Sequence, residues 1–146
     1  MTTQTKDNLK IVTKDALGRV NGFLIPVYNI HDRFLSEDKA PQQVYVTVIE
    51  PRQIKGPHLH YIRTGCFTCV MGNARIVLRT AAGYEVYYSG ELHKYRSIIV
   101  PTGVPAALQN IGDGYAMIIN TPSPAWTPEM NDEYSADFSD FDFGMV

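Results

Sequence analysis

The densest group of chemically versatile side chains lies at residues 55–61, where the sequence reads Lys-Gly-Pro-His-Leu-His-Tyr. Because side chains alternate along an extended chain, His58 and His60 should point to one face of a strand and Leu59 to the other. Two imidazoles on one face can bind a metal ion, act as acid and base, or hydrogen-bond a ligand. The neighbouring Lys55 adds a positive charge. Two structural histidines are the alternative, but this combination favours a functional site.

Residues 55–61 must be positioned by the surrounding chain, in which short apolar runs are separated by turn residues. Runs spaced about ten residues apart are typical of an all-β sandwich or barrel. The turns at 71–73 (Met-Gly-Asn) and 112–114 (Gly-Asp-Gly) are predicted to be hairpin turns, because Gly and Asn tolerate positive φ. No window keeps a helical period over three turns, so helix is expected only briefly, near 31–37. The predicted strands lie at 43–50, 74–80, 84–89, 96–100, 106–111 and 115–120.

The overall composition suits one globular domain spanning 1–146. Apolar residues make up 45% and charged residues 19% of the 146, enough to fill one core. A net charge of −2 gives no reason to expect nucleic acid as a partner. No apolar run approaches the roughly 18–20 residues that span a bilayer, and the first ten residues lack the apolar core of a signal peptide. We therefore expect a cytoplasmic protein without a membrane partner.

The two ends of the domain differ from its middle. Residues 1–14 are predicted to form a leading arm. Residues 127–146 form an acidic-aromatic segment, with six acidic residues and no basic one between Glu129 and Asp142, interrupted by Phe138, Phe141 and Phe143. It is either a solvated tail or a strap whose aromatic residues pack across the barrel while its carboxylates stay in water.

Cys66 and Cys69 form a Cys-x-x-Cys pair. A redox function would place this motif at the start of a helix that follows a strand. The surrounding β-branched and aromatic residues predict a strand instead, where positions three apart point to opposite faces. We therefore expect two buried, small apolar side chains.

The order of the motifs resembles the cupin superfamily: His-x-His at 58–60, then Gly72, then Pro-Thr-Gly at 101–103. Metal-binding cupins add a Glu four or five residues after the second His and a His three residues after the last Gly. Here those places hold Thr64 or Gly65 and Ala106. Two histidines fall short of three protein ligands, so we predict no metal and no other cofactor. Cys66 is the one candidate for a further metal ligand.

The closer resemblance is to the metal-free cupins that act on nucleotide-linked keto sugars, the dTDP-4-dehydrorhamnose 3,5-epimerases and the dTDP-sugar 3,4-ketoisomerases. The ketoisomerases carry Arg-Gly-x-His-Ala-His, and His58 and His60 match both histidines. The resemblance runs over about residues 15–143. It continues through Pro-Thr-Gly-Val-Pro at 101–105, Gln-Asn-Ile-Gly-Asp at 109–113, Asn-Thr-Pro at 120–122 and the segment 126–133. It implies a double-stranded β-helix, or jelly-roll barrel, of about ten strands and a homodimer.

The resemblance also implies roles for the residues of the His-x-His stretch. His58 is the general base that removes a proton next to the keto group. His60 orients the sugar or acts as a second acid or base. Lys55 replaces the family's Arg and keeps a positive charge near the oxyanion or the phosphate. Trp126 takes the neighbourhood of the tyrosine that supplies the acid in 3,5-epimerases, and an indole cannot donate that proton.

Further residues are candidates for acid and for ligand binding. Tyr61, Tyr87, Tyr88 and Tyr115 could replace the missing acid. Arg75 and Arg79 share one face of a strand, either in solvent or facing the ligand, and Arg63 and Lys94 are further cations for a diphosphate. A base could stack on Tyr45 or Tyr84, although strand aromatics are often core residues. The predicted substrate-binding set is Arg75, Arg63, Tyr45, Asn110 and Trp126.

The function predicted from the sequence is a metal-independent epimerase or ketoisomerase of a nucleotide-diphosphate-linked 4-keto-6-deoxy sugar, in deoxysugar or polysaccharide biosynthesis. One alternative is a non-catalytic cupin that binds carbohydrates or nucleotide sugars. Another is a metal-dependent cupin that uses His58 and His60 with a third ligand.

Overall fold

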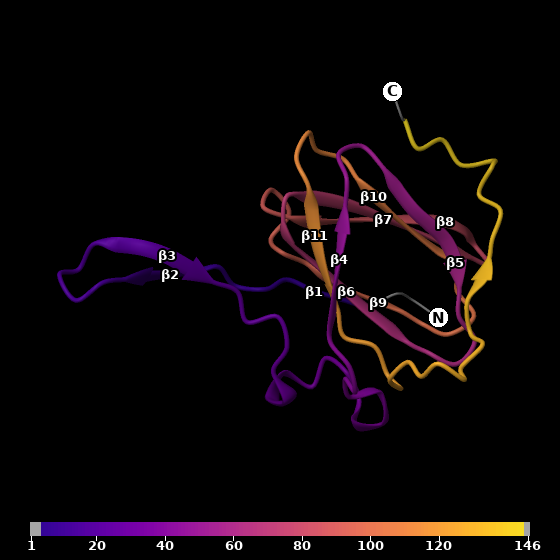
Figure 1. Cartoon of the computed structure of the whole chain (residues 1–146), viewed down its shortest axis with the longest axis horizontal. Helices are drawn as coiled ribbons and strands as arrows, with labels where there is room; N and C mark the ends of the chain where they lie inside the picture. Colours follow the sequence, from indigo (N-terminus) through magenta and orange to yellow (C-terminus); the bar gives the residue numbers. More distant parts are fainter. Residues whose placement is uncertain (1–3, 145–146) are drawn as a thin grey trace.

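The computed structural model describes residues 4–144, which form a β-barrel with a projecting hairpin (Figure 1). Two five-stranded antiparallel sheets face each other. The first sheet has the order β1(Thr5–Lys6), β9(Ser97–Val100), β6(Gly65–Met71), β11(Ala116–Asn120), β4(Tyr45–Ile49). The second has the order β12(Tyr134–Ser135), β5(Ile54–Leu59), β10(Ala106–Asn110), β7(Asn73–Thr80), β8(Gly83–Gly90). The all-β prediction is confirmed.

Three smaller groups complete the structure. The hairpin pairs β2(Ile11–Lys14) with β3(Val20–Leu24). Two short 3₁₀ helices, η1(Ile30–Asp32) and η2(Glu37–Lys39), lie close to where brief helix was expected. No helix in the described part of the chain is long and apolar enough to cross a membrane.

The core lies between the two sheets, because alternate side chains of each strand point inward. Ile49 and Ile118 meet Cys69 in one cluster, and Ile76 and Ile98 belong to another, all fully or almost fully buried. Burial raises the pKa of Cys66 to about 11 and that of Cys69 to about 12. Both thiols are therefore protonated at neutral pH, as expected for buried apolar side chains and not for redox thiolates.

The glycine turns differ from their prediction. The turns at 71–73 and 112–114 were expected to close hairpins, but β6 does not share a sheet with β7, nor β10 with β11. Each turn instead carries the chain from one sheet to the other. Gly72 has a φ of 74°. Glycine adopts such a positive φ as readily in a hairpin turn as in a turn that joins two sheets. The local signal marks a sharp turn, and only the long-range pairing decides which strands follow it.

The C-terminal segment lies over the outer face of the second sheet. Phe138 is buried against Val77 and Ala107. Two arginines of β7 reach the backbone of the segment: Arg75 Nη2 donates to the Phe143 carbonyl (2.5 Å) and Arg79 Nη1 to the Asp137 carbonyl (2.5 Å). The segment therefore packs as a strap and is held by backbone contacts as well as by its aromatic rings.

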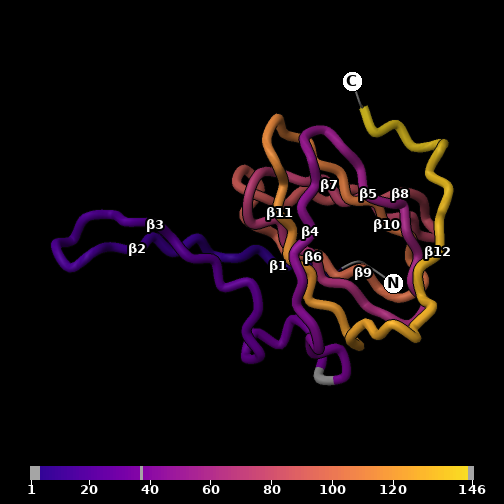
Figure 2. The backbone as a smooth tube through the Cα atoms, in the orientation of Figure 1, coloured from indigo at the N-terminus to yellow at the C-terminus, as the bar shows by residue number. Residues whose placement is uncertain are grey.

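Much of the chain before β4 forms the projecting hairpin (Figure 2). The leading arm was predicted at residues 1–14, but the element that stands off the barrel continues to Leu24. The strands predicted from the sequence do not include residues 19–24, where Gly22 lies in β3. β1, which precedes the hairpin, pairs with β9 of the barrel.

The side chain of Asn110 stabilises the turn that leads into β11 by hydrogen bonds. Its Nδ2 donates to the carbonyls of Ile49 (2.9 Å), Glu50 (3.1 Å) and Gly114 (2.8 Å). Its Oδ1 accepts from the Gly112 N–H (2.9 Å). The side chain is fully buried. These contacts give Asn110 a structural role that its predicted place among the substrate-binding residues did not include.

Replacement of Asn110 by Ala should lower the free energy of unfolding by about 2–3 kcal/mol, because buried backbone groups lose their partners. Urea unfolding followed by circular dichroism measures this loss. Asn21→Ala is the control, because Asn21 makes an exposed side-chain hydrogen bond to Thr13 on the hairpin; it should change stability by less than about 0.5 kcal/mol. Equal losses in both variants would contradict the role of Asn110.

Candidate active site

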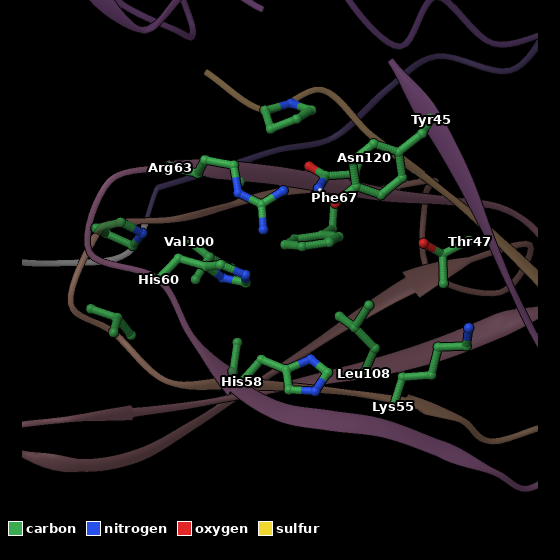
Figure 3. Close-up of a pocket in the computed structure, with 15 residues that line it drawn as sticks. Tyr45, Thr47, Lys55, His58, His60, Arg63, Phe67, Val100, Leu108 and Asn120 are labelled. Carbon is green, nitrogen blue, oxygen red and sulfur yellow. Dashed lines mark hydrogen bonds between the residues drawn. The ribbon is translucent and has the colours of Figure 1, made fainter. Parts of the chain in front are cut away.

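A cavity opens between the sheets beside His58 and His60 (Figure 3). Its volume is about 150 Å³. That is below the roughly 300–1,000 Å³ of pockets that enclose a whole drug-sized ligand. Its wall combines apolar side chains with a small set of polar and basic groups. The residues that line it are Tyr45, Thr47, Lys55, His58, His60, Arg63, Gly65, Phe67, Val100, Pro101, Val104, Ala106, Leu108, Asn120 and Pro122.

The geometry of β5 brings Lys55 and His58 to the same cavity. Residues three apart on a regular strand would point to opposite faces. Here the register between β5 and β10 shifts, with Leu108 opposite Lys55 but Ala106 opposite His58. Gly56 lies inside this irregularity with a φ of 88°, and a Cβ there would approach the Ala106 carbonyl oxygen to 3.0 Å. Glycine is therefore required at this point of the strand.

Glu133 supplies a carboxylate that faces both histidines. Its Oε1 lies 3.6 Å from His58 Nδ1 and 3.7 Å from His60 Nε2. These distances suit ion pairs and exceed those of hydrogen bonds. A carboxylate beside Nδ1 favours the tautomer of His58 that carries its proton there, which leaves Nε2 as the basic nitrogen. The arrangement resembles that of a general base, His58, whose ring is oriented by a neighbouring carboxylate, Glu133.

The preceding residue, Asp132, fixes the strap at the site. Its side chain is 2% exposed and accepts three backbone N–H bonds, from Tyr61 (2.8 Å), Ile62 (2.9 Å) and Arg63 (2.9 Å). Burial alone would raise the pKa of Asp132, but these donors and the nearby His60 outweigh it, so the pKa lies below its usual 3.8. The ionised carboxylate thus ties the strap to the loop that follows His60.

Register places Glu133 next to the histidines. After Asp132, β12 pairs with β5, with Tyr134 opposite Leu59 and Ser135 opposite His58. Glu133 lies between the Asp132 anchor and this pairing, so its backbone is held on both sides. The fold therefore fixes the backbone from which the Glu133 side chain reaches the histidines.

Two buried nitrogen atoms of the site have no hydrogen-bond partner: His60 Nε2 and Arg63 Nε. Buried polar groups are normally paired, so such atoms mark places for a ligand or water. The Arg63 side chain is 11% exposed, and its Nε lies 3.8 Å from Asp132 Oδ2. Burial and the positive charge of Arg63 lower the pKa of His60 below its usual 6.5. His60 is therefore a neutral imidazole near neutral pH.

Tyr45 provides a hydroxyl group on another wall of the cavity (Figure 3). Its oxygen accepts a hydrogen bond from Asn120 Nδ2 (2.6 Å), and Asn120 Oδ1 accepts from the Cys66 N–H (3.0 Å). Because the oxygen of Tyr45 is the acceptor in this contact, its own O–H remains available to donate to a ligand.

The structure brings most of the predicted site together but not all of it. Lys55, His58, His60, Arg63 and Tyr45 line the cavity. Arg75 lies beneath the strap, where its Nε donates to Gln109 Oε1 (2.7 Å). The Asn110 side chain is engaged in hydrogen bonds to the turn before β11. Trp126 is 50% exposed and its backbone N–H donates to Gln43 Oε1 (3.0 Å). None of these three lines the cavity, nor do the tyrosines proposed as acids, Tyr61, Tyr87, Tyr88 and Tyr115.

Glu133 and Asp132 were missed as site residues. The motif at the end of the resemblance included both, but nothing in the sequence said which strand they would join. Among residues 4–144, no group of three His, Cys, Asp or Glu side chains is arranged to hold a metal ion. Cys66, the one candidate for a further ligand, is buried in β6 and does not line the cavity.

Replacement of Asp132 by Ala should release the strap from the loop and leave three N–H groups without their acceptor. We expect a loss of about 2–4 kcal/mol in unfolding free energy, because hydrogen bonds to a charged group are among the stronger ones. Since the pKa of Asp132 is lowered, this contribution is present above pH 3.8 and is lost as the pH falls through the lowered value. Asp137→Ala, at an exposed strap carboxylate that caps Ser139, is the control; an equal loss there would contradict the anchor.

The lowered pKa of His60 predicts a pH dependence of stability. The unfolded chain binds the proton more tightly than the folded one, so stability is full above about pH 6.5 and declines as the pH falls toward the folded pKa. His60→Gln removes this component. Urea unfolding between pH 5 and 8 should therefore show the native chain losing stability relative to the variant on acidification; parallel curves would contradict a buried, neutral His60.

Comparison with known proteins gives likenesses in structure only: no family model and no curated protein sequence matches this chain. A dTDP sugar isomerase from Desulfovibrio desulfuricans G20 superposes with a TM-score of 0.77 at 16% identity, over 92% of this chain and 83% of that one. ChmJ, a 3′-monoepimerase from Streptomyces bikiniensis in complex with dTDP-quinovose, gives 0.74 at 15% identity, over 94% and 71%.

QdtA, a sugar 3,4-ketoisomerase from Thermoanaerobacterium thermosaccharolyticum in complex with TDP, gives a TM-score of 0.67 at 14% identity, over 90% of this chain and 86% of that one. These similarities extend over nearly the whole chain at low sequence identity. The chain therefore has the cupin jelly-roll fold that these sugar-nucleotide epimerases and isomerases share.

Proposed function

We propose that this protein is an epimerase or ketoisomerase that moves a proton next to the keto group of a nucleotide-linked 4-keto sugar. The observation that carries the proposal is the array of His58, Glu133 and His60 at a cavity that also contains Arg63 and Lys55. The fold likeness to epimerases and isomerases of dTDP sugars supports the substrate class.

The chemistry begins with an acidic C–H bond. A 4-keto sugar loses a proton from C3 or C5 because the resulting charge spreads onto the carbonyl oxygen. His58 Nε2 takes this proton, and Glu133 stabilises the imidazolium that forms, since its carboxylate lies 3.6 Å from Nδ1. A general base of this kind contributes roughly 10²–10⁴-fold to the rate.

The enolate needs positive charge and hydrogen-bond donors near its oxygen. Arg63 suits this role, because its Nε is buried without an acceptor and its guanidinium offers only donors. Lys55 lies at the same cavity but is exposed, which suits contact with a phosphate at the entrance. The two cations therefore divide the tasks of holding the oxyanion and the diphosphate.

Protonation of the enolate on another face or at another atom completes the reaction. Tyr45 replaces the four tyrosines predicted from the sequence as our candidate for the acid, because it lines the cavity and its O–H is available to donate. Delivery to the opposite face of the same carbon gives epimerisation, and delivery to a different atom gives ketoisomerisation. His60, neutral near pH 7, is the candidate for a second acid or base.

The size of the cavity suits partial enclosure of a large ligand. A volume of about 150 Å³ leaves the nucleotide outside when the sugar ring enters. The basic residues at the site would then face the diphosphate between the two parts. The proposal also includes the cytoplasmic location and the role in deoxysugar or polysaccharide biosynthesis that were predicted from the sequence.

The proposal predicts exchange of a sugar proton with solvent. Incubation of dTDP-4-keto-6-deoxyglucose with the protein in deuterated water, followed by NMR, should show deuterium at C3 or C5. His58→Asn should reduce the exchange roughly 10²–10⁴-fold by removing the base, and Tyr45→Phe should slow the conversion to product more than the exchange. His93→Asn is the control, because His93 packs on Tyr88 away from the cavity.

The outcomes separate the proposal from its alternatives. Absence of exchange with dTDP- and other nucleotide-linked 4-keto sugars, in protein that is folded, would overturn it. A rise in melting temperature with the nucleotide sugar but no exchange would favour the non-catalytic binding protein. Exchange that disappears with a chelator, together with stoichiometric metal in untagged protein, would favour the metal-dependent cupin.

A further inference from the structure

Asn120 connects Tyr45, the candidate acid, to the middle of the first sheet. It is the last residue of β11, and the antiparallel register places it opposite Tyr45 of β4 on one side and opposite Phe67 of β6 on the other. All three side chains line the cavity (Figure 3). Asn120 is 3% exposed. A buried amide of this kind is normally held by partners for its polar atoms.

One backbone group decides which way the amide of Asn120 faces. The Cys66 N–H donates to Asn120 Oδ1 (3.0 Å), and a backbone N–H can only be a donor. With the amide turned round, Nδ2 would face this N–H and two donors would be in contact. The next residue holds the Cys66 peptide in place, because the Thr121 N–H donates to the Cys66 carbonyl (3.1 Å). The amide oxygen is therefore fixed toward β6 and the amide nitrogen toward Tyr45.

The fixed amide determines the direction of the hydrogen bond at Tyr45. Asn120 Nδ2 lies 2.6 Å from the Tyr45 hydroxyl oxygen and, as an NH₂ group, can only donate to it. The Tyr45 oxygen is therefore the acceptor, and its hydrogen cannot point back at Asn120. Tyr84 gives the contrast within this chain, because its O–H donates to the carboxylate of Asp140. The type of side chain beside a tyrosine thus decides where the phenol directs its proton.

We propose that Asn120 is a positioning residue that makes Tyr45 present its proton to the ligand in the cavity. The inference rests on the proposed function, in which Tyr45 protonates the enolate. In that step a C–H bond forms at the enolate carbon while the Tyr45 O–H bond breaks, and the oxygen keeps the electron pair as a phenolate. Asn120 Nδ2 already donates to this oxygen, and a hydrogen bond to a charged acceptor is roughly twice as strong as a neutral one. Water then returns a proton to Tyr45.

Asn120→Asp reverses the hydrogen bond with little change of shape. The carboxylate keeps an acceptor for the Cys66 N–H, but its second oxygen takes the O–H of Tyr45. Deuterium exchange at C3 or C5 of dTDP-4-keto-6-deoxyglucose needs only the base and should stay close to the native rate. Conversion to product needs the acid and should fall by about 10²-fold or more. Asn21→Asp is the matched control, because it adds the same charge at an exposed amide of the hairpin; it should change neither rate.

A double variant distinguishes positioning from a structural role. Because Asn120 acts through Tyr45, Asn120→Asp should cause no further loss of conversion in a chain that already carries Tyr45→Phe. Additive losses would overturn the inference, as would an equal fall of exchange and conversion or no fall in either. Native protein that shows no exchange at all would instead overturn the proposed function, and the inference with it.

Raman spectroscopy tests the direction of the hydrogen bond without turnover, and does so even if Asn120→Asp does not fold. The intensity ratio of the tyrosine Fermi doublet differs between a phenol that accepts a hydrogen bond and one that only donates. The native spectrum minus that of Tyr45→Phe isolates the contribution of Tyr45, which should show an oxygen that accepts. The signature of a phenol that only donates would overturn the inference.

Discussion

The site depends on one buried carboxylate. Asp132 accepts three consecutive backbone N–H groups of the loop at 61–63, and this contact attaches the strap to the barrel beside the two histidines. A buried carboxylate is costly unless hydrogen bonds compensate it, and three donors do so here. Once Asp132 is fixed, β12 pairs with β5 and the backbone of Glu133 is held between the two contacts. This arrangement brings a carboxylate to face the two histidines.

Charged side chains of both signs lie around the cavity. Lys55 and Arg63 are cationic, His58 and His60 can bind protons, and Glu133 is the carboxylate facing the histidines. Asp132 offsets part of the charge of Arg63 but is itself occupied by backbone donors. The low pKa of His60 arises from the same environment, because burial and Arg63 both disfavour its protonated form. A ligand with hydrogen-bonding groups could satisfy the two buried nitrogens, His60 Nε2 and Arg63 Nε.

The sequence predicted the parts of the site that depend on local geometry. His58 and His60 are two residues apart, so they share one face of a strand. The neighbouring strands are recognisable from their short apolar runs and from the turn residues between them. Lys55 reaches the same cavity through a register shift that spacing alone would not indicate. Arg75 and Asn110 had the right chemistry for ligand binding, but packing gave them other partners. Glu133 could not be assigned, because its place depends on pairing between strands far apart in the sequence.

Glu133 lies immediately before β12, the last described strand, and this order affects how the site is assembled. During synthesis, every other strand of both sheets leaves the ribosome before the residue that faces the histidines. A nascent barrel can therefore contain the cavity and its cations while it still lacks the carboxylate. Under the proposed function, the carboxylate that faces the base is therefore added after the scaffold, so the two can be gained or lost separately. Proteolytic removal of the strap from a finished barrel would return it to that earlier, incomplete condition.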